Sequence, residues 1–208
     1  EAHLIVPMGE WALRRACFDA VQWPSQVKVA VNVSADQLMN ANFISSVVSA
    51  LRDSGLPAQR LELEVTESLF LRDGGMAVQV LDQVLALGIK LSLDDFGTGY
   101  SSLGYLRKTR FNTIKVDRSF VTGAAKGVDE CLAIIRAVVA MADSLKMSTT
   151  AEGVETEEEL ELIRRLGCKK IQGYLFGRPM SFNDTLPMFE PNLSHDRRDL
   201  YRKVELGA

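Results

Sequence analysis

The chain has 208 residues, with 24 lysines and arginines against 27 acidic residues, and a formal net charge of −3. A content of 47% hydrophobic and 25% charged residues is typical of a globular protein that buries a sizeable core, and it excludes a disordered chain. A nucleic-acid polymer is not an expected partner, because its binders usually carry a strong basic excess.

Nothing in the sequence directs the chain to a membrane. The longest apolar stretch, 132–142, is interrupted by Arg136 and is too short to cross a bilayer. The first residues do not resemble a signal peptide. We therefore expect a cytoplasmic domain, and a membrane anchor upstream in a parent protein stays open.

The cysteines and histidines narrow the kinds of site that are possible. Cys17, Cys131 and Cys168 lie far apart, so neither a disulfide framework nor a zinc site is expected. The two histidines, His3 and His195, lie near the termini, where they do not suit a Ser-His-Asp or Cys-His mechanism. Any catalysis must therefore use carboxylates, amides and lysines.

Short β-branched runs alternate with longer amphipathic stretches along the chain. We expect strands over 27–33, 61–65, 89–94, 113–116, 147–151 and 170–173. We expect helices over 8–21, 43–54, 75–87, 101–106, 129–145, 157–166 and 182–188. Gly55, Gly88 and Gly167 suit left-handed helix ends, and Thr156 with Glu159 forms a capping-box pattern.

Alternation of strand and helix predicts an α/β fold with a parallel sheet. Six strand–helix units follow an opening helix that has no strand before it, whereas a closed barrel has eight strands. We therefore expect a TIM-like (β/α) barrel whose first strands are missing from this chain. An open doubly wound sheet is the alternative, because six strands would satisfy it.

Polar residues follow nearly every expected strand at its carboxyl end. They are Asn32, Glu64, Asp94, Asp95, Lys115, Asp117, Glu152 and Gln172. In a barrel these ends meet at one face, where barrel enzymes keep their active sites. Carboxylates gathered there need compensating cations, and oxygen ligands suit Mg²⁺, Mn²⁺ or Ca²⁺. The consecutive acids Asp94 and Asp95 could serve a pair of ions, as in phosphoester hydrolysis.

Each of these residues also has a simpler interpretation. A single acid at a strand end is commonly a helix N-cap or a solvated loop residue, and Asn32 alone would suit a turn. Glu62 and Glu64 lie on the same face of the expected strand, so their spacing does not show which of them is a metal ligand. Lys115 is harder to dismiss, because a lysine inside an apolar strand needs a partner. The glycine-rich run 96–100 is either a flexible loop or a lid over the site.

The motifs at these strand ends resemble the bacterial EAL domain. The resemblance runs from about residue 4 to residue 182, in the family's order and spacing, and its most specific part is Asp-Asp-Phe-Gly-Thr-Gly. The matching segments are 31–34, 64–68, 94–103, 114–117, 151–156 and 172–179. The resemblance implies an EAL-type phosphodiesterase domain over 1–190, followed by a charged helix or tail over 191–208.

By that resemblance, the activity is hydrolysis of cyclic di-GMP to linear pGpG with two Mg²⁺ or Mn²⁺ ions, in bacterial signal transduction. Asn32, Glu64 and Asp94 are similar to metal ligands of the family. Asp95 resembles a ligand of the second ion that also meets the substrate, with Asp117 in its network. A homodimer and an upstream sensory or cyclase domain are also implied.

The resemblance also supplies expected roles outside the ligand set. Lys115 is similar to the catalytic lysine that holds the attacking water, and Glu152 to an acid of the metal and water network. Glu67 resembles the glutamate that anchors a lid beginning at Phe96. Gln172 is similar to a residue that holds the polar network and the substrate.

The signature Glu-Ala-Leu itself is absent from the sequence. Residues 4–11 resemble the stretch that follows it, so we expect either a fragment that begins after the first strands or a degraded domain. The other motifs are intact, which favours a fragment. We expect the 208-residue chain alone to hydrolyse cyclic di-GMP poorly, because the signature glutamate is a metal ligand in this family.

Two other functions compete with the phosphodiesterase. A non-hydrolytic cyclic di-GMP receptor or interaction module could use the same barrel, but it would be expected to have lost metal ligands. A sugar-processing barrel with a carboxylate pair explains neither Lys115 nor Asn32.

Overall fold

The computed structural model describes residues 4–97 and 103–189, so the expected tail over 191–208 lies outside the described residues. The chain divides into two compact units. The first unit comprises Glu1–Asp94 and Gly99–Asn112, and the second comprises Asp95–Thr98 and Thr113–Ala208.

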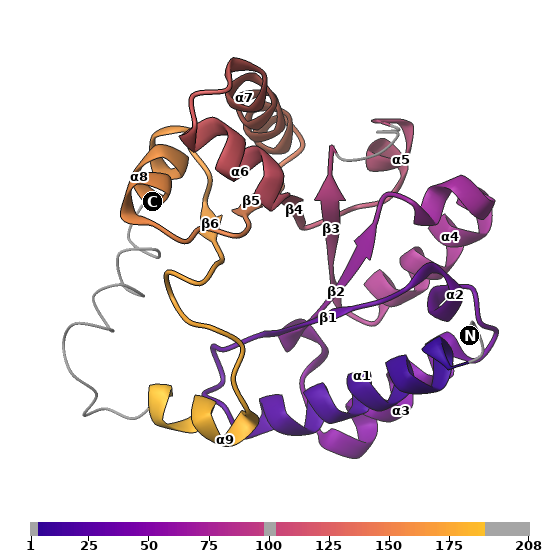
Figure 1. Ribbon diagram of the computed structural model, residues 1–208. Coiled ribbons are helices and arrows are strands. Elements are labelled where there is room, and N and C mark those ends of the chain that lie inside the picture. The colour runs from indigo at the N-terminus through magenta and orange to yellow at the C-terminus, as the bar shows by residue number, and fades with distance from the viewer. Residues whose placement is uncertain (1–3, 98–102, 190–208) are drawn as a thin grey trace. The chain divides into compact units, whose positions relative to one another are not determined.

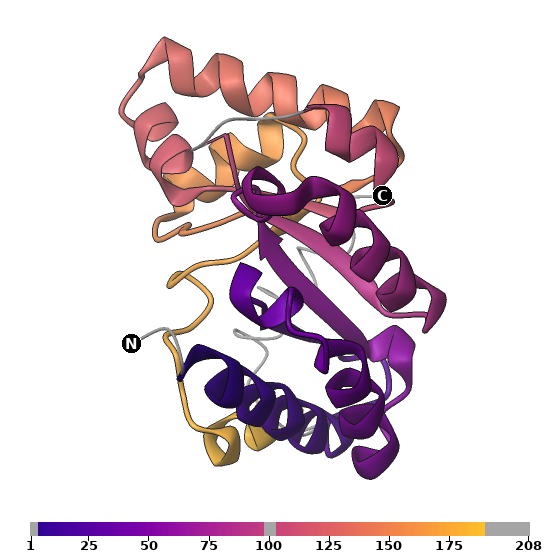
Figure 2. The ribbon, with the colours of Figure 1, turned by 90° about the vertical axis from the view of Figure 1, so that its right-hand side faces the viewer.

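The first unit contains three parallel strands that are neighbours in chain order. They are β1 (Val29–Asn32), β2 (Leu61–Thr66) and β3 (Lys90–Phe96), whose last two residues count with the second unit. Its helices are α1 (Ile5–Val21), α2 (Ala35–Leu38), α3 (Phe43–Ser54), the 3₁₀ turn η1 (Ala58–Arg60), α4 (Leu69–Ala86) and α5 (Leu103–Lys108). Helix α1 packs along α3 and against β1 (Figure 1; Figure 2).

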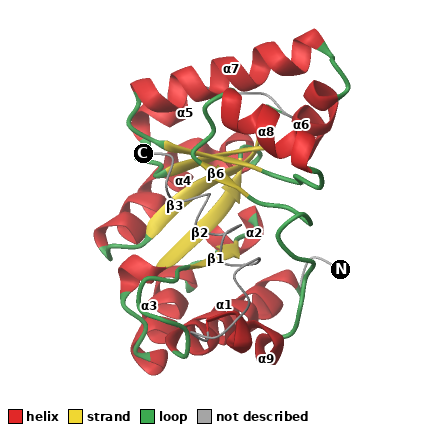
Figure 3. Ribbon diagram, turned by 90° about the vertical axis from the view of Figure 1, so that its left-hand side faces the viewer, coloured by secondary structure: helices red, strands yellow, loops and turns green. Residues whose placement is uncertain are grey.

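The second unit repeats the pattern with three more parallel strands. They are β4 (Thr113–Val116), β5 (Ser148–Ala151) and β6 (Lys170–Ile171). Its helices are α6 (Arg118–Ala125), α7 (Asp129–Ser144), α8 (Glu157–Arg165), α9 (Phe182–Thr185) and the 3₁₀ turn η2 (Leu186–Phe189). Helix α7 packs on β4 and β5, and α6 packs against α7 and α8; Figure 3 colours these helices red and the strands yellow.

The two faces of the first unit's sheet differ in polarity, as period-two alternation requires. One face carries buried aliphatic side chains: Val29, Val31, Leu61, Leu63, Val65, Leu91 and Leu93. The other face carries Asn32, Glu62, Glu64, Ser92 and Asp94. A doubly wound sheet buries apolar residues on both faces, so this polar face favours the TIM-like (β/α) repeat.

The expected elements and turn signals are largely confirmed. Strand 113–116 and helix 43–54 match to the residue. Gly55, Gly88 and Gly167 have φ angles of 73°, 86° and 90°, as left-handed helix ends require. The capping box also forms, with Glu159 N donating to Thr156 Oγ1 and Thr156 N donating to Glu159 Oε2, both at 3.2 Å.

The differences lie where local propensity is weak. Helix α4 begins at Leu69, six residues before its expected start at 75, because burial of Leu69 and Phe70 outweighs the low helix propensity of two consecutive glycines. Helix α2 is a single turn, too short to show a period, and α6 contains the weak helix formers Thr122 and Gly123. Both were missing from the sequence expectation.

Arg60 ties the end of helix α1 to the start of the sheet. Its Nη2 donates to the carbonyl oxygen of Ala20 at 2.6 Å and of Trp23 at 3.4 Å, and its Nε donates to that of Val27 at 2.8 Å. Basic side chains satisfy the carbonyls that a helix end leaves unpaired. Arg60 is therefore a structural residue of the first unit.

We expect Arg60→Ala to lower the free energy of unfolding by about 1–3 kcal/mol, because half-buried carbonyls lose a charged donor. The free energy of unfolding of Arg60→Lys should lie between those of the wild type and Arg60→Ala, because an ammonium group cannot make all the hydrogen bonds of a guanidinium group. Urea unfolding would measure the loss, with Arg136→Ala on exposed α7 surface as the control. An Arg60→Ala midpoint equal to that of the wild type would contradict this role.

The three cysteines are free, as expected. Burial raises the pKa of the Cys17 and Cys168 thiols to about 11, so both stay protonated and unreactive near neutral pH. Neither of these two thiols therefore suggests a nucleophile or a zinc ligand.

Candidate active site

The carboxyl ends of the first unit's strands bring three of the expected ligands to one face. Asn32, the last residue of β1, lies in register with Glu64 on β2. Asp94 on β3 lies in register with Thr66, two residues beyond Glu64. Neighbouring residues of a parallel sheet point to the same side, so Asn32, Glu64 and Asp94 share the polar face.

Register also separates the two glutamates that spacing could not distinguish. Glu62 pairs with Ala30 and Lys90, further from the carboxyl ends than Glu64, and is 8% exposed. Glu64 is the one that stands beside Asn32.

The second unit pairs a buried lysine with a carboxylate at the same kind of position. Lys115 on β4 is only 4% exposed, and its Nζ lies 2.6 Å from Oε1 of Glu152, the residue that follows β5. The backbone fixes this pairing, because Glu152 N donates to the Val116 carbonyl at 3.0 Å. A lysine so deeply buried keeps its charge only beside an anion, and Glu152 supplies it.

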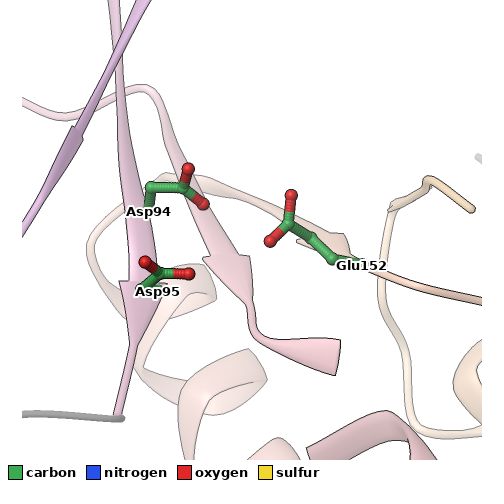
Figure 4. A group of neighbouring side chains, drawn as sticks. All are labelled: Asp94, Asp95 and Glu152. Carbon is green, nitrogen blue, oxygen red and sulfur yellow. The ribbon is translucent and has the colours of Figure 1, made fainter. Parts of the chain in front are cut away.

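Asp95 adds a second carboxylate to this arrangement. Its ligand oxygen lies within 4.8 Å of that of Glu152. Asp95 has a φ angle of 53°, which is uncommon for a residue with a side chain and interrupts the alternation of strand β3. Figure 4 shows that Asp95 and the preceding Asp94 leave the strand on the same side.

The chemistry of the carboxylate pair in the second unit, Asp95 and Glu152, suits a divalent cation. Its donors are carboxylate oxygens, the ligands that Mg²⁺, Mn²⁺ and Ca²⁺ prefer. Lys115, which pairs with Glu152, offsets only part of the negative charge of the two carboxylates. Carboxylates gathered this closely favour a bound cation over mutual repulsion.

Three other candidates have local interactions of their own. Asp117 is the N-cap of α6, with its Oδ1 accepting from Ser119 N at 2.9 Å, so the helix-cap interpretation holds for this residue whatever else it does. Gln172 is exposed just past β6, and its backbone N donates to the Ala151 carbonyl at 2.8 Å. Glu67 lies between β2 and α4, where its carbonyl accepts from Phe70 N at 3.1 Å.

Most of the expected lid lies outside the described residues, which stop at 97 and resume at 103. The roles assigned to Glu67, Asp117 and Gln172 therefore stay predictions. Sequence reasoning missed Arg118 and Glu155, which form an ion pair at 2.9 Å beside Glu152. Arg118 lies in α6, a helix that the sequence did not predict.

No helix in the described part of the chain is long and apolar enough to cross a membrane.

The fold and the polar residues at the strand ends of each unit define a (β/α) protein with carboxylates at those ends. The model of the EAL domain family matches residues 1–179, and the chain belongs to that family. It is 44% identical over 181 residues to the Pseudomonas aeruginosa protein named bifunctional diguanylate cyclase/cyclic di-GMP phosphodiesterase MucR. That match covers 85% of this chain and 26% of MucR, so the chain spans about a quarter of the length of this relative.

Solved structures agree with the family. The MucR phosphodiesterase in complex with c-di-GMP superposes with a TM-score of 0.85 at 42% identity, covering 88% of this chain and 76% of that one. Klebsiella pneumoniae BlrP1, solved with manganese and c-di-GMP, gives a TM-score of 0.76 at 30% identity, covering 84% and 45%. The expected EAL-type fold is thereby confirmed.

Proposed function

We propose that the natural protein containing this sequence hydrolyses cyclic di-GMP to linear pGpG, using two Mg²⁺ or Mn²⁺ ions. The observation that carries the proposal is the buried Lys115–Glu152 pair, with Asp95 beside Glu152. A receptor that only binds the nucleotide would be expected to have lost metal ligands, whereas the sequence keeps Asn32, Glu64, Asp94 and Asp95. The relatives named as cyclic di-GMP phosphodiesterases support the same activity.

The cations would be held by Asn32, Glu64, Asp94 and Asp95. Asp117, between β4 and α6, would belong to the same ligand network. Bound cations would polarise the phosphodiester and stabilise the charge that develops on it. In the proposal this oxygen-donor set does not distinguish Mg²⁺ from Mn²⁺.

The remaining roles belong to groups of the chain itself. Lys115 donates hydrogen bonds from its ammonium to the attacking water and to the phosphate, and its charge offsets negative charge as the phosphorus–oxygen bond breaks. Glu152 orients Lys115 through their 2.6 Å contact. Gln172 and Asp95 contact the substrate, and Glu67 anchors the segment that begins at Phe96.

The partners in this proposal are cyclic di-GMP, a second copy of the protein, and a sensory or cyclase domain in the same polypeptide. Location in the cytoplasm, where the nucleotide is a messenger, belongs to the same proposal.

Substrate preference tests the proposal. The natural protein in Mn²⁺ should convert cyclic di-GMP to pGpG and leave p-nitrophenyl phosphate almost untouched, because a two-ion site suits a bridging diester. Chromatography of the nucleotides and absorbance of nitrophenol would measure the two rates. Comparable turnover of both compounds would contradict the proposal. Tight binding of cyclic di-GMP with no conversion would support the receptor instead.

A further inference from the structure

Glu152 stands at the start of a short segment, 152–155, that the backbone holds on both sides. Glu152 N donates to the Val116 carbonyl at 3.0 Å, and Val154 N donates to the Gln172 carbonyl at 3.1 Å. Leu175 N in turn donates to the Val154 carbonyl at 3.1 Å. The segment is therefore pinned between the end of β4 and the chain that follows β6.

Two glycines permit this close packing. Gly153 has a φ angle of 68°, and a β-carbon at this position would overlap the side-chain stem of Arg118. A β-carbon at Gly173 would overlap the backbone of Val154. The segment is thus packed between the Arg118 stem on one side and the Gly173 backbone on the other.

Arg118 also holds the far end of the segment. Its Nη2 lies 2.9 Å from Oε1 of Glu155, so the side chain passes over Gly153 and reaches Glu155. The two side chains are 56% and 37% exposed, and an ion pair so exposed adds little to folding stability. An effect of Arg118 on the position of segment 152–155 can therefore be measured apart from any effect on folding stability.

We propose that Arg118 is a positioning residue for Glu152, and this inference rests on the proposed phosphodiesterase activity. Arg118 begins α6 directly after Asp117 and three residues after Lys115, so it couples the β4 end to the segment that carries Glu152. Catalytic groups must be held within about 0.5 Å of their productive position. Loss of an outer residue that orients such a group commonly costs about 10–100-fold in activity or metal affinity.

The test measures kcat, KM and the Mn²⁺ concentration for half-maximal rate in the natural protein. We expect Arg118→Ala to lower kcat about 10-fold with KM for cyclic di-GMP nearly unchanged, and to raise the half-maximal Mn²⁺ concentration. Arg118→Lys, which keeps the stem and the charge, should restore most of the rate. In a Glu152→Gln background, Arg118→Ala should have almost no further effect, because residues that act through one another are not additive. Arg136→Ala is the matched surface control.

The inference would be overturned if the kcat of Arg118→Ala lay within about twofold of the wild type. It would also be overturned if Arg118→Ala lowered kcat by the same factor in the Glu152→Gln background as in the wild type. Arg118→Met guards against a folding defect, because it keeps the stem over Gly153 and removes only the pair with Glu155. A loss of kcat in Arg118→Met at an unchanged melting temperature supports the inference, and an unchanged kcat would overturn the part assigned to the ion pair. A wild-type protein without hydrolysis would overturn the proposed function and this inference together.

Discussion

Replacing Lys115 with methionine is expected to lower the rate of cyclic di-GMP hydrolysis by about 10²–10³-fold. Lys115 is buried and stands 2.6 Å from Glu152, so the substitution removes a fixed positive charge from the place where negative charge develops. Methionine keeps the unbranched stem and the packing of strand β4. Single-turnover rates at saturating nucleotide would show that the substitution slows the chemical step.

Lys169→Met is the matched control, because Lys169 lies directly before β6 and forms an exposed ion pair with Asp143 at 2.6 Å. Its rate should equal that of the wild type. A Lys115→Met protein that stays folded and retains more than about a tenth of the wild-type rate would remove Lys115 from the catalytic role.

Asp95→Asn is expected to abolish most of the stabilisation by Mn²⁺ and to lower hydrolysis by about 100-fold or more. Asparagine tolerates the left-handed backbone that Asp95 adopts, so the substitution removes the charge and leaves the strand geometry in place. A cation bound only by the folded protein raises stability by about 2.7 kcal/mol at 100 times its dissociation constant. The rise in melting temperature on adding Mn²⁺ therefore reports the ligand without any need for turnover.

Glu161→Gln on exposed helix α8 should leave the response to Mn²⁺ intact. Asp95→Ala separates the two effects of the residue, because alanine loses the charge and also tolerates the left-handed conformation poorly. If Asp95→Asn kept the full Mn²⁺ response, Asp95 would not be a ligand, and its backbone conformation would need another explanation.

The sequence predicts the strand ends well, because a strand and the polar residue near its end are recognised from the residue types of one short segment. Alternating apolar residues followed by Asn32, Glu64, Asp94 or Glu152 indicate the carboxyl end of a strand to within two residues. Parallel topology then places these residues on one edge without any knowledge of distances. For the same reason the Lys115–Glu152 contact could be anticipated as a need of Lys115 for an anion, although the choice of Glu152 required the register of β4 and β5.

The rest depended on backbone geometry that no pattern of residue types encodes. The left-handed conformation of Asp95 is invisible in the sequence, because such conformations are ordinarily assigned to glycine, asparagine or turns. The sequence could not show whether Asp117 is a helix cap or a metal ligand, because helix α6 was not predicted. The Arg118–Glu155 pair joins two elements that only the folded chain brings together.

In the proposed reaction, a water molecule opens one phosphodiester of cyclic di-GMP at a cation-dependent site built from these strand ends. The most direct test incubates the natural protein with cyclic di-GMP in ¹⁸O-water, with Mn²⁺ or with a chelator, and analyses the nucleotides by mass spectrometry. We expect pGpG that carries one ¹⁸O atom in its terminal phosphate, formed with Mn²⁺ and suppressed by the chelator. Cyclic di-GMP that stays intact with Mn²⁺ present, or pGpG formed equally well in the chelator, would contradict it.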